Sequence, residues 1–196
     1  EAAPHLLYEI IDPFAACTVV DWVKMVKSEI TKNDQKVLIV GGSGFYIKAL
    51  TEGLSPIPDL QGNVRAELMQ RLENEGLEIL YKELQSCDLE LALKLQSSDR
   101  QRIIRGLEVF KSTGRKLSDW QKEPKEKLPF DFDVQLVLPE REELYQRCDA
   151  RFLKMIDQGV IDEVKKFIKT TNDKDNALTK ALGFSELRSY LKGELK

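Results

Sequence analysis

The chain has 196 residues, a formal net charge of −3 and a hydrophobic fraction of 42%. This composition allows one substantial hydrophobic core, or one core with a small appendage, and no apolar run is long enough to cross a membrane. Three widely spaced cysteines and a single histidine argue against a disulfide framework and the usual zinc sites, but not against an oxygen-bound Mg²⁺. We therefore expect a cytoplasmic protein with no membrane span and no structural metal.

The N-terminal part predicts a helix, a strand and a glycine-rich turn in succession. Apolar residues at helical spacing predict a helix over Val19–Ile30, and the β-branched run Val37–Val40 predicts a buried strand. The turn Gly41–Gly44 follows at once and carries one hydroxyl, that of Ser43. Backbone amides at the carboxyl end of a buried strand bind ligands in α/β proteins, although Gly-Gly-Ser-Gly is also an ordinary tight turn. A short helix is expected over Tyr46–Leu50.

The middle and C-terminal parts predict mainly helices. After a linker with two prolines and a glycine, residues 59–127 are rich in Leu, Glu, Lys and Arg and predict an all-helical insert. Beyond the insert, an apolar run predicts a second strand at Val134–Leu138. Together the strands and helices favour an α/β protein. The further helices are expected near Val64–Glu75, Leu77–Gln85, Gln101–Phe110 and Glu140–Gln158, with a break at Gly159 and more helix to about Lys169.

One segment of the insert, residues 100–116, is strongly basic. It holds six Lys and Arg residues and a single acidic residue, Glu108. Helical spacing puts Gln101, Arg102 and Arg105 on a face opposite the apolar stripe. Guanidinium groups on such a face suit phosphates and stacking on unpaired bases, whereas a solvated helix surface is the simpler alternative.

Two longer motifs carry a family resemblance. Residues 41–58 read GGSGFYIKALTEGLSPIP, and residues 98–118 read SDRQRIIRGLEVFKSTGRKLS. These segments resemble two motifs of the tRNA dimethylallyltransferase family, also called tRNA isopentenyltransferases, with Ser43 in place of a threonine. Shorter matches in the same order occur at Pro4–Pro13, Arg151–Val164 and Ala181–Phe184.

The resemblance implies a fold and an activity. The implied fold is a P-loop nucleotide-kinase-like parallel sheet core, formed by residues 1–58 and 128–196, with a small helical domain at 59–127 that binds the anticodon stem-loop of tRNA. The implied reaction moves a dimethylallyl group from dimethylallyl diphosphate to N6 of the adenosine on the 3′ side of the anticodon. Mg²⁺ is the implied cofactor, since it suits the departing diphosphate, and a monomer is expected.

The resemblance also implies roles for individual residues. Ser43 matches a threonine of the family's catalytic site and is expected to act in catalysis and at the tRNA. Arg151 and Arg65 match family residues that bind the diphosphate, and Arg65 is also a candidate for tRNA binding. The other expected tRNA-binding residues are Gln101, Arg102 and Arg105.

The family's N-terminal phosphate loop has no counterpart in this sequence. No G-x-x-x-x-G-K-[ST] pattern occurs, and Gly42-Ser43-Gly44 lacks the lysine that reaches a phosphate. We therefore expect the first strand and phosphate loop to be absent and the chain to be an enzyme fragment that is inactive by itself. Two alternatives stay open: an adenylate isopentenyltransferase acting on a free nucleotide, and a non-catalytic RNA-binding module.

Overall fold

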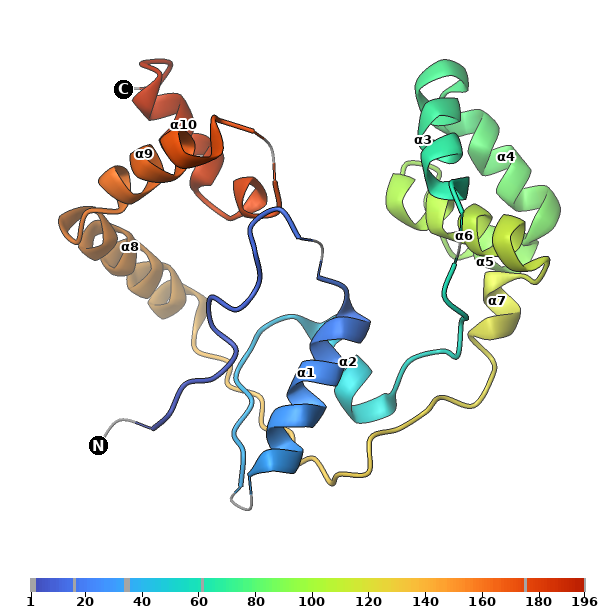
Figure 1. Ribbon diagram of the computed structural model, residues 1–196, viewed down its shortest axis with the longest axis horizontal. Coiled ribbons are helices and arrows are strands. Elements are labelled where there is room, and N and C mark those ends of the chain that lie inside the picture. The colour runs from blue at the N-terminus through green and yellow to red at the C-terminus, as the bar shows by residue number, and fades with distance from the viewer. Residues whose placement is uncertain (1–2, 16, 34–35, 61, 175, 196) are drawn as a thin grey trace. The chain divides into compact units, whose positions relative to one another are not determined.

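The computed structural model describes residues 3–15, 17–33, 36–60, 62–174 and 176–195 (Figure 1). These residues divide into two compact units, one of residues 37–130 and one that combines residues 1–36 with 131–196. No described helix is long and apolar enough to cross a membrane. The helices are α1 (Val19–Lys32), α2 (Gly44–Glu52), α3 (Val64–Glu75), α4 (Leu77–Cys87), α5 (Leu89–Leu93), α6 (Arg100–Thr113), α7 (Leu117–Trp120), α8 (Arg141–Asp157), α9 (Val160–Thr171), the 3-10 helix η1 (Leu178–Lys180) and α10 (Phe184–Leu191).

The two expected strands are not formed. Val37–Val40 and Val134–Leu138 have no regular secondary structure, and side chains such as Leu38 and Val137 are 86% and 85% exposed. A strand is stable only when a neighbouring strand takes up its backbone hydrogen bonds, and neither segment pairs with another in the described part of the chain. The prediction of strands at these two segments is wrong for this structure, and the predicted parallel sheet core is not confirmed.

The predicted helices are confirmed, and their ends have local causes. At the start of α1, Thr18 and Asp21 form a capping box: the Asp21 amide donates to Thr18 Oγ1 at 3.2 Å and the Thr18 amide donates to Asp21 Oδ2 at 3.0 Å. Asp99 caps α6 by accepting from the Arg102 amide at 3.1 Å, and Gly114 ends α6 in the left-handed conformation. The predicted break at Gly159 separates α8 from α9.

Helices α3 to α7 form a cluster with its own hydrophobic core, drawn in green to yellow in Figure 1. Helix α6 lies against α3, α4 and α7. A Cβ atom added to Gly106 of α6 would lie 2.7 Å from a Leu91 methyl carbon and 2.8 Å from a Leu84 methyl carbon, so glycine permits this close packing. The buried residues of the core are Leu68, Leu80, Leu84, Leu91, Ala92, Ile103, Ile104, Leu107, Val109 and Leu117.

One buried carboxylate links two short helices of the cluster. Asp88 is 0% exposed, and its side chain accepts from the amide of Leu91 at 3.1 Å and from that of Ser118 at 2.9 Å. The first bond caps α5, and the second reaches the start of α7. The sequence did not predict either of these helices, which are only five and four residues long.

The segments that enter and leave the helical cluster lie beside each other. Leu54 and Glu126 form an isolated antiparallel bridge, and Lys125 Nζ donates to Glu52 Oε2 at 3.2 Å. Gly53 has a φ of 82°, and a Cβ atom there would lie 2.3 Å from the Glu126 carbonyl oxygen. Glycine is therefore required where the two segments meet.

The unit that contains α8, α9 and α10 buries much less of its apolar surface. Helix α8 has no buried residue, although it is 17 residues long. Val164 of α9 and Phe184 of α10 are each 8% exposed, and the rings of Phe167 and Phe184 meet edge to face at 5.7 Å. These contacts hold α9 and α10 together.

Candidate functional site

Ser43 stands at the N-terminus of α2 with its hydroxyl free of the helix. Its carbonyl oxygen accepts from the amides of Tyr46 at 2.9 Å and Ile47 at 3.2 Å, which starts the helix. Its side chain is exposed and makes no capping hydrogen bond. The hydroxyl can therefore donate to, or accept from, a bound molecule.

Arg65 and Arg105 meet at one carboxylate inside the helical cluster. Glu108 Oε2 lies 2.9 Å from Arg105 Nη1 on the same helix and 3.3 Å from Arg65 Nη1 on α3. The Glu108 side chain is 10% exposed, whereas those of Arg65 and Arg105 are 56% and 43% exposed. The carboxylate is thus inside, and both guanidinium groups extend to solvent.

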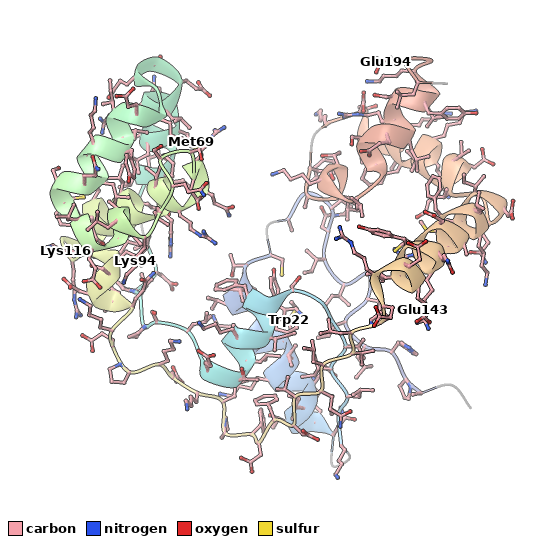
Figure 2. All side chains as sticks on the ribbon, turned by 180° about the vertical axis from the view of Figure 1, so that it is seen from behind. Trp22, Met69, Lys94, Lys116, Glu143 and Glu194 are labelled. Atoms are coloured by element: carbon pink, nitrogen blue, oxygen red, sulfur yellow. The ribbon has the colours of Figure 1, made fainter. Side chains whose placement is uncertain are left out.

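The other two predicted tRNA-binding residues lie in the first turn of α6. Arg102 Nη1 donates to Asp99 Oδ2 at 2.9 Å, and the Arg102 side chain is 73% exposed. Gln101 is exposed beside it. On α3, Met69 follows Arg65 by one turn and accepts at its sulfur from Arg100 Nη2 at 3.7 Å; Met69 is labelled in Figure 2. The structure therefore brings Arg65 next to the basic residues of α6, while no described contact joins Ser43 to them.

The basic segment 100–116 is less one-sided than its sequence indicates. Lys111 Nζ lies 2.6 Å from Glu83 Oε1 of α4, and Arg115 pairs with Glu123 and covers the Trp120 ring at 4.5 Å from its centroid. With the pairs of Arg102 and Arg105, four of the six basic residues therefore have a carboxylate partner. Sequence reasoning missed Glu83 because it lies far from the segment in the chain.

Arg151 lies in the other unit, on the exposed surface of α8. No described carboxylate pairs with it. It lines a hollow of about 570 Å³ between α8, α9, η1 and α10, together with Asp149 and Glu163. The rest of the lining is mostly apolar and includes Phe152, Met155, Val164, Phe167, Phe184 and Leu187. Most of the lining belongs to the two shorter motif matches, Arg151–Val164 and Ala181–Phe184, although nothing in their sequence predicted a hollow.

Among the residues that the structure describes, no group of three His, Cys, Asp or Glu side chains could hold a metal ion. No residue of the chain is therefore assigned to Mg²⁺.

Comparison with known proteins identifies the family. The family model described as IPP transferase matches residues 1–196. The chain belongs to the IPP transferase family. A protein of Novosphingobium aromaticivorans named tRNA dimethylallyltransferase is 36% identical over 98% of this chain and 69% of its own length. One of the same name from Rhizobium etli is 38% identical over 100% of this chain and 67% of its own length.

A solved structure shows the same relationship. The full-length tRNA isopentenylpyrophosphate transferase of Bacillus halodurans matches with a TM-score of 0.55 and 28% identity, over 98% of this chain and 60% of that protein. The chain thus spans about two thirds or less of the length of these IPP transferase relatives. The family match includes every residue discussed above but gives none of them a role.

Proposed function

We propose that the protein transfers a dimethylallyl group from dimethylallyl diphosphate to N6 of the adenosine on the 3′ side of the anticodon in tRNA. The observation that carries this proposal is the IPP transferase match over residues 1–196, joined by relatives named tRNA dimethylallyltransferase. The proposal includes a monomer that acts in the cytoplasm.

The exposed basic residues of the helical cluster are the proposed contact with the anticodon stem-loop. Arg65 and Arg105 project from two helices around one carboxylate, and Arg102 and Gln101 lie on the first turn of α6. Guanidinium groups bind phosphate through several donors and stack on unpaired bases. The position of Arg65 beside Arg105 supports its assignment to RNA rather than to the diphosphate.

The chemical step requires activation of the attacking amine and stabilisation of the departing diphosphate. The bond between N6 and the first carbon of the dimethylallyl group forms, the bond from that carbon to the diphosphate oxygen breaks, and N6 gives one proton to a base. An aromatic amine is a poor nucleophile and diphosphate leaves with negative charge, so a positioned hydroxyl and a guanidinium both contribute.

Two residues of the chain suit those roles. The free hydroxyl of Ser43 can donate to the bridging oxygen of the diphosphate or orient the amine. Arg151, an exposed cation at an apolar hollow, can bind the diphosphate. When bound, Mg²⁺ would neutralise diphosphate charge, and it stays part of the proposal without an assigned ligand.

The test compares Ser43→Ala with Ser43→Thr in the product of the whole coding sequence, with radiolabelled dimethylallyl diphosphate and tRNA. Loss of a donor aimed at developing charge should lower turnover by about 10- to 1,000-fold, while tRNA affinity stays constant. Ser43→Thr keeps the hydroxyl and should retain most activity. Unchanged turnover in Ser43→Ala would refute the catalytic role.

The same assay tests the choice of acceptor. Prenyl transfer to tRNA or to an anticodon stem-loop, and not to free AMP, is the expected result. Transfer to AMP alone would support an adenylate isopentenyltransferase, and no transfer with intact RNA binding would support a non-catalytic RNA-binding module.

A further inference from the structure

We propose that Glu108 is a positioning residue for RNA binding, which holds the guanidinium groups of Arg65 and Arg105 in the geometry that receives the RNA backbone. The proposal rests on the function proposed above, because it requires the helical cluster to bind RNA. Glu108 itself does not touch RNA in this arrangement.

Burial of the carboxylate is the first reason. A carboxylate with a side chain only 10% exposed is costly unless it is paired, and here one oxygen, Oε2, lies near a guanidinium nitrogen of each arginine. Glu108 is therefore held in place by the helix core around it, since Leu107 and Val109 on either side are 0% exposed. Because the Glu108 carboxylate has little freedom to move, it restricts the two guanidinium groups that are bound to it.

The donors left over are the second reason. A guanidinium has five N–H donors, and the described bonds to Glu108 use one nitrogen of each arginine. The remaining donors belong to side chains that are about half exposed, so they are available to phosphate oxygens. Arg65 comes from α3 and Arg105 from α6, so the shared carboxylate also sets the spacing between cations from two helices.

Preorganisation of this kind contributes to affinity. Ordering a long side chain on binding costs free energy, and the salt bridges to Glu108 have already ordered two of them. Without the carboxylate, each arginine would have to be ordered by the RNA itself.

A simpler role for Glu108 predicts that its removal changes RNA affinity in the opposite direction. If the carboxylate only neutralises charge, its removal makes the cluster more positive and RNA binding tighter, with a steeper dependence on salt. If it positions the arginines, its removal weakens binding despite the gain in positive charge.

A matched control lies in the same cluster. Glu83 also bridges two cations, with Arg71 Nη1 at 2.7 Å and Lys111 Nζ at 2.6 Å, and none of the three is a predicted RNA-binding residue. Glu83→Gln therefore causes the same change in net charge and breaks the same kind of bridge.

The experiment measures the affinity of the whole chain for a labelled anticodon stem-loop RNA with an unmodified adenosine 3′ to the anticodon. Glu108→Gln, which preserves shape, should weaken binding by about 5- to 100-fold, the range for two arginines that lose their order. Glu83→Gln should leave affinity unchanged or raise it slightly. Equal or tighter binding by Glu108→Gln would overturn the proposal.

A double-mutant cycle separates positioning from general destabilisation. Arg65→Ala plus Arg105→Ala should weaken binding, and Glu108→Gln added to that pair should have no further effect, because Glu108 acts through these arginines. A further loss of similar size would overturn the proposal in favour of a structural role.

The cycle also separates this proposal from the proposed function. If the arginine pair can be removed without loss of affinity, the assignment of RNA binding to this face fails, and the role of Glu108 fails with it. If removal of the pair weakens binding but Glu108→Gln does not, only the positioning role fails.

A measurement without RNA completes the test. Nitrogen-15 NMR of the arginine side chains should show restricted rotation of the Arg65 and Arg105 guanidinium groups, and faster rotation in Glu108→Gln. Arg102, whose partner is Asp99, should be unchanged in that variant. Equal rotation in both proteins would mean that Glu108 does not order these side chains.

Discussion

Helices α6 and α8 are each the longest helix of their unit, and both are rich in charged residues. They differ completely in burial. Six of the 14 residues of α6 are buried, including Ile103, Ile104 and Leu107, whereas none of the 17 residues of α8 is buried. Helix α6 is packed by its neighbours within one continuous stretch of chain, α3 to α7. An amphipathic pattern thus shows which face of a helix can be buried, and the neighbours decide whether it is.

This difference implies that the helical cluster carries its own stability. Its core residues all lie between Leu68 and Leu117, so the contacts that bury them form within about fifty residues of chain. The apolar side chains on α8, such as Leu153 at 62% exposure, contribute little by comparison.

The largest effect is expected from truncating an apolar side chain on each of the two helices. Leu107→Ala removes a side chain that is 0% exposed and should lower the free energy of unfolding of the cluster by about 2–5 kcal/mol. Leu153→Ala on α8 should change it by less than about 0.5 kcal/mol. Urea unfolding followed by the fluorescence of Trp120, in a Trp22→Phe background, measures both. Equal effects would show that the cluster is not an independent core.

The second effect concerns a fully buried carboxylate, that of Asp88, and a partly exposed one, that of Asp99, both at helix N-termini of the cluster. Asp88→Ala leaves the amides of Leu91 and Ser118 without their acceptor in a buried place and should cost about 2–3 kcal/mol. Asp99→Ala removes the cap of α6, where water can replace it, and should cost about 1 kcal/mol. The same unfolding assay applies, and the prediction fails if Asp99→Ala is the more damaging change.

The smallest effect is a pH dependence that belongs to the helical cluster alone. Burial by itself raises the pKa of Glu83, but hydrogen bonds from Lys111 and Arg71 outweigh it and hold that pKa below its ordinary value of 4.5. Because the pKa of Glu83 is lower in the folded chain than in the unfolded one, its ion pairs with Lys111 and Arg71 stabilise the fold fully above pH 4.5. This contribution is lost as the pH falls through the pKa of Glu83 in the folded chain.

Glu83→Gln should therefore reduce stability by about 0.2–1 kcal/mol at neutral pH, and the difference from the parent chain should vanish in acid. Asp173 is the control in the other unit, where a hydrogen bond from Lys192 also lowers its pKa. Asp173→Asn should not move the transition reported by Trp120 at any pH. If Asp173→Asn shifted the unfolding transition of Trp120 as much as Glu83→Gln does, the two units would unfold together.

The sequence by itself determined the longer helices α1 to α4, α6, α8 and α9, and it indicated the family. The break at Gly159 was predicted from the chain, and the side-chain caps at Thr18 and Asp99 involve residues only three positions away, because a helix is built from contacts three and four residues apart. The motifs around Ser43 and Gln101 pointed to the IPP transferase family, which the match over the whole chain established.

Only the tertiary structure decided what these elements meet. Val37–Val40 has the composition of a buried strand but lies exposed, because a strand depends on partners that its own residues do not supply. The basic segment 100–116 reads as one-sided charge, yet Glu83 and Glu123 pair with it from other elements. Likewise, the shared carboxylate of Glu108 joins Arg105, three residues away, to Arg65, 43 residues away. Long-range ion pairs of this kind leave no periodic signal in a sequence, since packing of the helices alone brings the charges together.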